Sequence, residues 1–185
     1  MSRQFWSETL AWATADGTAV ANSTTETIAF PNVTIPGNFL QDGRSLRMRV
    51  FGRHSTTATP TLTFRLRWGG VTGTVVAASG AITCGSAVTN APWEIDLILT
   101  TRSNGSTGTV MGNGSVSVWD DAAPTVGSTT NSPGVSALCA GGGVAPAAVT
   151  LDLTADTALS ITAQWGTASA SNTLTGHNYI IEALN

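Results

Sequence analysis

The amino-acid sequence predicts an all-β protein, an antiparallel β-sandwich of jelly-roll-like type. Residues 45–50 and 61–68 alternate an apolar side chain with Arg, Thr or Ser at every step. A period of two is typical of a strand with one buried side and one solvent-facing side. No helical periodicity extends beyond two turns, and no longer repeat indicates a solenoid or propeller. The 185 residues suit one domain, because all-β sandwiches often reach this length as a single unit.

The N-terminal half supplies an arm and the first strands. Residues 1–24 carry large apolar groups without a regular pattern, and Asp16-Gly17 indicates a turn. We therefore predict an N-terminal arm over residues 1–24 that covers either its own sandwich or a neighbouring subunit. The β-sandwich domain is expected to follow over residues 25–185. Its first strands are expected at 25–30, 33–35, 45–53 and 61–68.

Gly and Pro punctuate the second half of the chain. The stretch 107–119 contains Gly112-Asn113-Gly114, which predicts a hairpin turn or a bulge. Residues 120–147 are rich in Gly, Pro and Ser and show no pattern, so we expect a long protruding loop there. Loops of this length are usually functional or disordered. The remaining strands are expected at 74–77, 93–101, 149–153, 159–165 and 178–184.

These elements amount to about nine to eleven strands, enough for two packed layers. An immunoglobulin-type sandwich is the competing fold, because Trp93 and Trp119 lie between Cys84 and Cys139. Both cysteines lie in Gly-rich or Ser-rich surroundings and not in a convincing core strand. That context favours the jelly-roll-like fold, and it favours two free thiols over a disulfide.

Charged residues make up 10% of the chain, well below the roughly 25% that is usual. All eight basic residues are Arg, the cation that is enriched in the cores of interfaces, although genomic composition explains the absence of Lys equally well. The net charge of −3 argues against a nucleic-acid partner. No apolar run is long enough for a membrane span or a secretory signal, so we expect a protein made in the cytoplasm, or one whose signal has been removed.

Six of the eight arginines fall between residues 44 and 67. If strands 45–53 and 61–68 are neighbours, four of these arginines form a basic stripe on one outer face. Such a stripe is either a docking surface for an acidic partner or another subunit, or a solvated face balanced by Glu94 and Asp96 on an adjacent strand. Together with the aromatic residues of the arm, the candidate interface residues are Phe5, Trp6, Trp12, Arg47, Arg49, Arg65 and Arg67.

No catalytic constellation is evident in the sequence. Glu94 and Asp96 stand about 7 Å apart along one side of a strand, and carboxylate pairs can hydrolyse glycosidic bonds, but such pairs arise on any polar strand face. His54 and His177 have no metal-binding spacing, and no phosphate-binding or nucleophile motif occurs. We therefore expect no enzymatic activity, no metal and no cofactor. The tryptophans at strand ends are expected to cap the core more than to stack on sugars.

Several segments resemble small virion proteins of tailed bacteriophages. The similarity covers about two-thirds of the chain and lies in Gly43–Gly52, Asn90–Gly114, Leu159–Trp165 and Asn178–Leu184. In the family a Trp-containing strand and Arg-Ser/Thr-x-Gly-x-x-Gly-Thr-Val precede a Gly-rich hairpin, as Trp93 and Arg102–Val110 do here. The resemblance implies a jelly-roll structural protein, often a trimer, on the capsid surface or in a head or tail fibre. It brings no catalytic residue with it.

The sequence as a whole therefore predicts a capsid decoration (cement) protein that stabilises the shell by non-covalent docking. The partners expected are other copies of the chain in a homotrimer and the major capsid protein or other virion proteins, with no nucleic acid and no membrane. The alternative is a receptor-binding or carbohydrate-binding module of a phage fibre. Its contact would come from residues 120–147 and the strand-end tryptophans.

Overall fold

The computed structural model describes residues 6–120, 134–140 and 146–184. Within them lie fourteen β-strands and no helix, which confirms the all-β prediction. Nine of the strands have five or more residues. The strands are β1 (Ser7–Trp12), β2 (Val20–Ala21), β3 (Thr27–Ile28), β4 (Val33–Ile35), β5 (Ser45–Ser55), β6 (Thr61–Trp68), β7 (Thr74–Ala78), β8 (Ile82–Thr83), β9 (Ala91–Ser103), β10 (Gly108–Val118), β11 (Gly134–Cys139), β12 (Val149–Leu151), β13 (Thr157–Trp165) and β14 (Thr173–Leu184).

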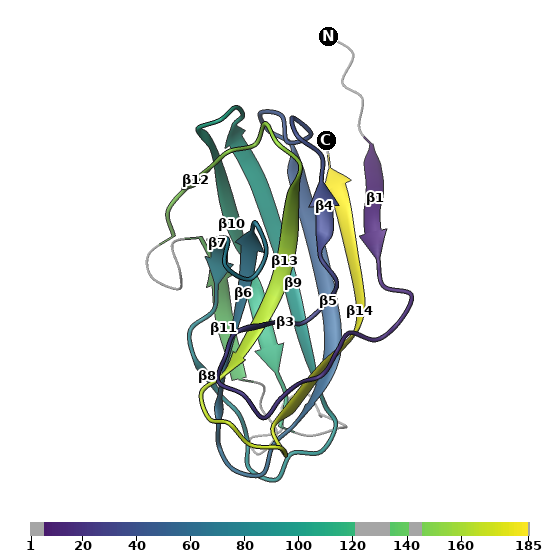
Figure 1. The fold of residues 1–185 in the computed structure, drawn as a ribbon, viewed down its shortest axis with the longest axis vertical. Coiled ribbons are helices and arrows are strands. Elements are labelled where there is room, and N and C mark those ends of the chain that lie inside the picture. The colour runs from purple at the N-terminus through teal and green to yellow at the C-terminus, as the bar shows by residue number, and fades with distance from the viewer. Residues whose placement is uncertain (1–5, 121–133, 141–145, 185) are drawn as a thin grey trace.

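All strand pairs are antiparallel, and they follow one path in the order β1-β14-β5-β9-β10-β11-β7-β6-β13-β3. The path folds back on itself into two layers (Figure 1). One layer holds β1, β14, β5, β9 and β10, and the other holds β7, β6, β13 and β3, with β11 joining them. The pairing is nested, because β5 pairs with β14, β6 with β13 and β9 with β10. This nesting is the jelly-roll-like feature of the sandwich.

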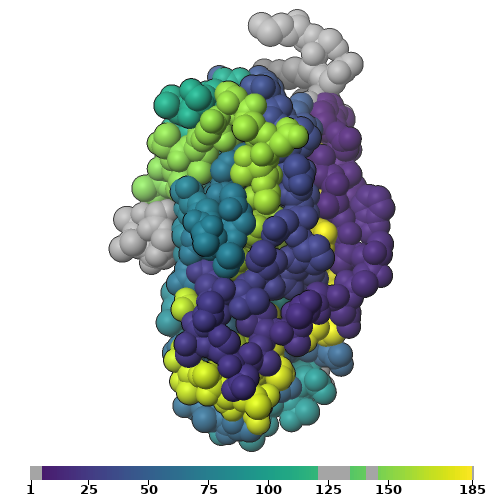
Figure 2. Space-filling model, viewed as in Figure 1, coloured from purple at the N-terminus to yellow at the C-terminus, as the bar shows by residue number. Residues whose placement is uncertain are grey.

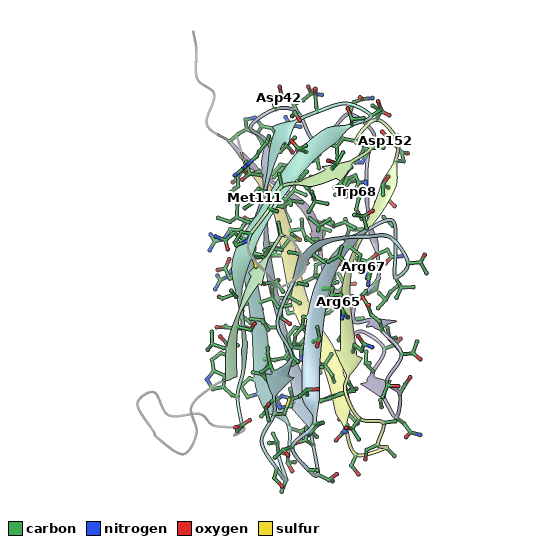
Figure 3. The ribbon with its side chains drawn as sticks, turned by 90° about the vertical axis from the view of Figure 1, so that its left-hand side faces the viewer. Asp42, Arg65, Arg67, Trp68, Met111 and Asp152 are labelled. Atoms are coloured by element: carbon green, nitrogen blue, oxygen red, sulfur yellow. The ribbon has the colours of Figure 1, made fainter. Side chains whose placement is uncertain are left out.

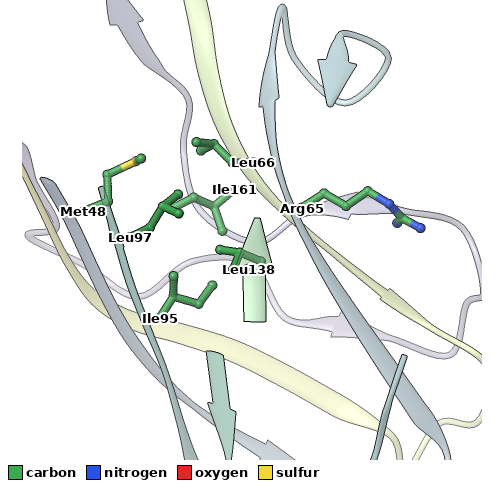
Figure 4. Close-up of a pocket in the computed structure, with 7 residues that line it drawn as sticks. All are labelled: Met48, Arg65, Leu66, Ile95, Leu97, Leu138 and Ile161. Carbon is green, nitrogen blue, oxygen red and sulfur yellow. The ribbon is translucent and has the colours of Figure 1, made fainter. Parts of the chain in front are cut away.

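The apolar sides of the two layers meet in one core. Met48, Ile95 and Leu97 of one layer face Leu66 and Ile161 of the other (Figure 4). Arg65, on the same strand as Leu66, extends away from this cluster toward the outside. The void between these side chains is about 10 Å³, roughly the smallest space that holds one water. The core is therefore packed and offers no room for a ligand at this point.

The period-two pattern places side chains as the sequence predicts. Along β5 and β9 every second residue is buried, including Leu46, Met48 and Val50 on β5. Three strand-end tryptophans, Trp68, Trp93 and Trp165, are also buried, which confirms their expected place in the core. The indole N–H of Trp165 donates to the carbonyl oxygen of Val20 at 3.0 Å.

Two local predictions are wrong. The Gly112-Asn113-Gly114 segment makes neither a hairpin turn nor a bulge, because β10 runs through it in continuous register with β9. A Cβ on Gly114 would lie 2.1 Å from the carbonyl oxygen of Asp96, so this glycine permits close approach of two strands and not a reversal of the chain. Within the loop predicted over residues 120–147, residues 134–139 form β11. The remainder of that loop lies largely outside the described residues.

The N-terminal region contributes to both layers. β1 pairs with β14 and forms one end of the strand order, while β3 and β4 pair with β13 in the other layer. In Figure 2 the N-terminal segment, coloured purple to blue, lies across the layer that contains β13. Ser160 and Thr162, on the outer side of β13, are buried by this segment. The Ser160 hydroxyl donates to the side chain of Asn32, and the Thr162 hydroxyl donates to the carboxylate of Glu26.

Candidate docking face

The other layer keeps its outer side uncovered by any described segment. We call this side the open face, and it consists of the outward side chains of β1, β14, β5, β9, β10 and β11. Register partners in antiparallel strands point to the same side, so the pairing fixes which residues are neighbours. The central row is Trp12, Ile180, Arg49, Asp96 and Ser115. The flanking rows are Asn178, Phe51, Glu94, Ser117 and Val135, and Thr9, Glu182, Arg47, Ile98 and Asn113.

The open face collects the exposed large apolar side chains of the described residues. Trp12 is 60% exposed, Ile98 45% and Val135 62%, and all three lie on this face. Half-buried Phe51 and Met111 add to the apolar surface between them. Figure 3 shows the sandwich edge-on, with Met111 on this side and Arg65 and Arg67 toward the opposite layer. The charged residues Arg47, Arg49, Glu94 and Asp96 lie among these apolar side chains. The gathering of the exposed large apolar groups on one face favours an interaction site there.

Charges on the open face are largely matched to one another. Arg47 and Arg49 on β5 both pair with Asp96 on β9, at 3.4 and 3.6 Å. These side chains are about half exposed, so each pair stabilises the fold by no more than about 1 kcal/mol. The Arg49 guanidinium also lies 5.5 Å from the centre of the Phe51 ring. The predicted balance between these arginines and an adjacent acidic strand is therefore present at Asp96.

The dimensions of the open face suit a protein partner. A fourth row passes through Ser45, Thr100 and Met111. Six strands about 4.8 Å apart and these four rows of side chains span about 24 by 20 Å, or about 500 Å². A specific interface needs about 500 Å² or more on each partner. One shallow depression of about 400 Å³ interrupts the flat surface on β9 and β10. It is lined by Ile98, Thr100, Arg102, Met111 and Asn113.

The predicted stripe of four arginines is wrong. After β5 the chain crosses to the other layer, so β5 and β6 are not neighbours, and Arg65 and Arg67 lie on the face opposite to Arg47 and Arg49. Arg67 is bound there by Glu26, with Nε to Oε1 at 2.5 Å and Nη2 to Oε2 at 2.7 Å. Arg65 donates to the same carboxylate at 3.1 Å. Both arginines are engaged within the chain and present little free charge.

Glu26 is the centre of this second cluster. Burial raises the pKa of Glu26, but hydrogen bonds from Arg67 and Thr162 and the charges of both arginines outweigh burial, so the pKa lies below its ordinary value of 4.5. The carboxylate therefore stays charged and ties the N-terminal segment to β6 and β13. This cluster has a structural role in the sandwich.

The aromatic residues of the arm have different surroundings. Trp6 is half-buried and packs against the core, with the Arg44 guanidinium 5.4 Å from its ring centre and 4.6 Å from that of Phe39. Trp12 points outward from β1 beside Ile180. Phe5 lies outside the described residues. Of the predicted interface residues, the structure thus brings Trp12, Arg47 and Arg49 together on the open face.

Most members of the open face were not among the predicted interface residues, and the apolar Phe51, Ile98 and Val135 are examples. A signal for two of them is present in the sequence. Phe51 and Ile98 are large apolar residues at solvent-facing positions of strongly alternating strands, where Thr, Arg or Asp is otherwise found. Val135 carries no such signal, because the Gly-rich, Pro-rich and Ser-rich segment around it predicts a loop.

The described part of the chain offers few other groups for metal binding or reactivity. Those residues contain no group of three or more His, Cys, Asp or Glu side chains that could hold a metal ion. The described residues form no helix that is long and apolar enough to cross a membrane. Cys84 is a buried free thiol, and burial raises its pKa to about 12, so it stays protonated at neutral pH. Because Cys84 is free, it forms no disulfide with Cys139.

Comparison with known proteins gives one structural likeness. No protein-family model matches the sequence, and no curated protein matches it. Among solved structures, the chain is similar to the CBM2 module of the evolved Dit protein of Lactobacillus casei BL23 phage J-1. The TM-score is 0.39 with 11% sequence identity, over 99% of this chain and 98% of that one. A likeness at this TM-score assigns no function to the chain.

Proposed function

We propose that the chain is a non-enzymatic structural protein of a bacteriophage virion that docks on other virion proteins through its open face. Within that class, a capsid decoration protein that cements the shell is the specific function proposed. One observation carries the docking role: the exposed large apolar side chains of the described residues, Trp12, Ile98 and Val135, share one face. Solvent-exposed apolar groups gathered in this way gain free energy when a partner covers them.

Composition and sequence resemblance support the virion assignment. Few charges and no Lys suit a surface that is desolvated on assembly. The segments that resemble tailed-phage virion proteins include β5 and β9, the two central strands of the open face. In the proposed mechanism, a homotrimer lays this face across the junctions between major capsid protein subunits. Three linked copies multiply a weak contact into stable attachment.

A carbohydrate-binding module is the second candidate function. Trp12 favours it, because an indole ring that is 60% exposed is a platform on which a sugar ring stacks. A glycan array distinguishes the two functions. A decoration protein gives no signal, whereas a carbohydrate-binding module gives one that Trp12→Ala abolishes.

Electron microscopy and mass spectrometry of particles from the phage that encodes the chain test the proposal. We expect the chain in purified particles, with the open face against the shell. Ile98→Asp places a charge at the centre of the face and should prevent attachment to particles that lack the chain. Thr74→Asp makes the same change at an exposed strand position of the other layer and should attach normally. Absence of the chain from particles, or attachment of Ile98→Asp at wild-type level, would contradict the proposal.

A further inference from the structure

Arg102 differs from the other arginines of the described residues. It is exposed near the end of β9, on the open face, and no described residue gives it a hydrogen bond or an ion pair. The Asp42 carboxylate, at the same end of the molecule, is engaged elsewhere, because it accepts a hydrogen bond from the backbone N–H of Asn104 at 2.6 Å. Each of the remaining six arginines has a partner. Arg44 donates to the Phe39 carbonyl, Arg53 donates to His177, Arg47 and Arg49 pair with Asp96, and Arg65 and Arg67 pair with Glu26.

Arg102 lines a depression on the open face. Ile98 and Met111 give this depression an apolar lining, and Thr100 and Asn113 complete it. Thr100 Oγ1 already bonds with Ser45 Oγ at 2.8 Å. The depression therefore offers two unused features side by side, which are an apolar surface and a cation with five N–H donors.

We propose that this depression receives a partner segment in which a bulky apolar side chain stands next to a carboxylate. The apolar side chain covers Ile98 and Met111, and the carboxylate pairs with Arg102. A guanidinium binds a carboxylate through two parallel hydrogen bonds, and such pairs beside a filled apolar pocket are typical interface hot spots. The inference rests on the proposed docking function and names the chemistry of the protein partner.

The charge pattern of the open face favours one carboxylate over a polyanion. Asp96, Glu94 and Glu182 lie on the same face together with Arg47 and Arg49, so these rows carry three carboxylates against two guanidinium groups. A run of acidic residues or phosphates laid across these rows gains no net attraction from them, whereas a single carboxylate at the end of β9 pairs with Arg102. The favoured segment is thus mainly apolar, with one acidic residue at a fixed place.

A random linear peptide library displayed against the purified full chain tests this inference. Peptides selected by the wild type should carry Asp or Glu next to a bulky apolar residue. Their affinity should fall about tenfold or more for Arg102→Glu, the loss of one charge-assisted pair. Arg53→Glu makes the same charge change about 34 Å away along the sheet and should bind as the wild type does. Exchanging the acidic residue of a selected peptide for Lys should restore its binding to Arg102→Glu.

The possible failures are distinguishable. Two outcomes overturn the Arg102 inference and leave the docking function in place. In the first, the selected peptides lack acidic residues. In the second, they bind Arg102→Glu as tightly as the wild type while Ile98→Asp abolishes binding. Peptides that bind regardless of Ile98→Asp and Trp12→Asp do not use the open face and contradict both proposals. Recovery of no binding peptide contradicts both as well.

Discussion

Arg67 holds the carboxylate of Glu26 with two hydrogen bonds, 41 residues away in sequence, on the face opposite to the open face. The side chains of Glu26 and Arg67 are only 14% and 16% exposed. By contrast, the Arg47–Asp96 pair on the open face has both side chains more than 40% exposed. Pairs of arginine with a carboxylate therefore serve different purposes on the two faces of one sandwich.

Glu26→Gln should destabilise the fold by about 2–3 kcal/mol, because it leaves two half-buried guanidinium groups without their anion. Asp96→Asn is the matched variant on the open face, and its cost should stay within about 1 kcal/mol because water solvates both arginines there. Urea unfolding followed by Trp fluorescence measures both. Equal losses of stability would show that the buried cluster does not hold the N-terminal segment.

Gly114→Ala should destabilise the sandwich by about 1–3 kcal/mol, because the added methyl group meets the backbone of β9 and forces two central strands apart. Gly80→Ala is the control. Its added methyl group would lie 3.5 Å from Ser136 Oγ, an ordinary contact, and its effect should stay within about 0.5 kcal/mol. Thermal unfolding of the two variants compares them, and similar midpoints would contradict the close approach of β9 and β10 at Gly114.

His54 should make the fold sensitive to mild acid. Burial lowers its pKa from the ordinary 6.5, while the hydrogen bond to the Ala91 carbonyl and the charge of Asp120 oppose burial only in part. The unfolded chain therefore binds the proton more readily, so stability is complete above pH 6.5 and declines as the pH falls from there through the lowered pKa.

The test for His54 is urea unfolding of the wild type and His54→Gln at pH 8 and pH 5. The wild type should lose more stability between the two pH values than the variant, which has no proton to gain at this position. An identical pH dependence in the two proteins would assign the acid sensitivity to other groups.

Alternation along single strands predicted the fold class and the inner sides of β5, β6 and β9, because a period of two directly encodes which side of a strand is buried. It did not predict which strands are neighbours. The four-arginine stripe failed for this reason: β5 and β6 are consecutive long strands, yet the chain changes layers between them. Strand order depends on contacts between residues far apart in sequence, which no local pattern contains.

The structural role of the glycines in Gly112-Asn113-Gly114 is also not determined by the local sequence. A Gly-Asn-Gly segment has the composition of a turn, and here it serves the close packing of two straight strands. Only the position of Asp96 on the neighbouring strand distinguishes the two uses. The open face is predicted from the sequence only in part. Arg47, Arg49 and Trp12 are among the predicted interface residues. The apolar residues near them lie on strands whose neighbours the sequence does not give.

Hydroxyl-radical footprinting of the chain, isolated and then bound to virion particles, tests the central claim most directly. Trp12, Met111 and Phe51 should react in the isolated chain and become protected on the particle, while buried Trp165 stays unreactive in both states. Exposed residues of the opposite layer should react equally in the two states. Unchanged reactivity of Trp12 and Met111 on the particle, or protection confined to the opposite layer, would contradict the assignment of the open face as the docking surface.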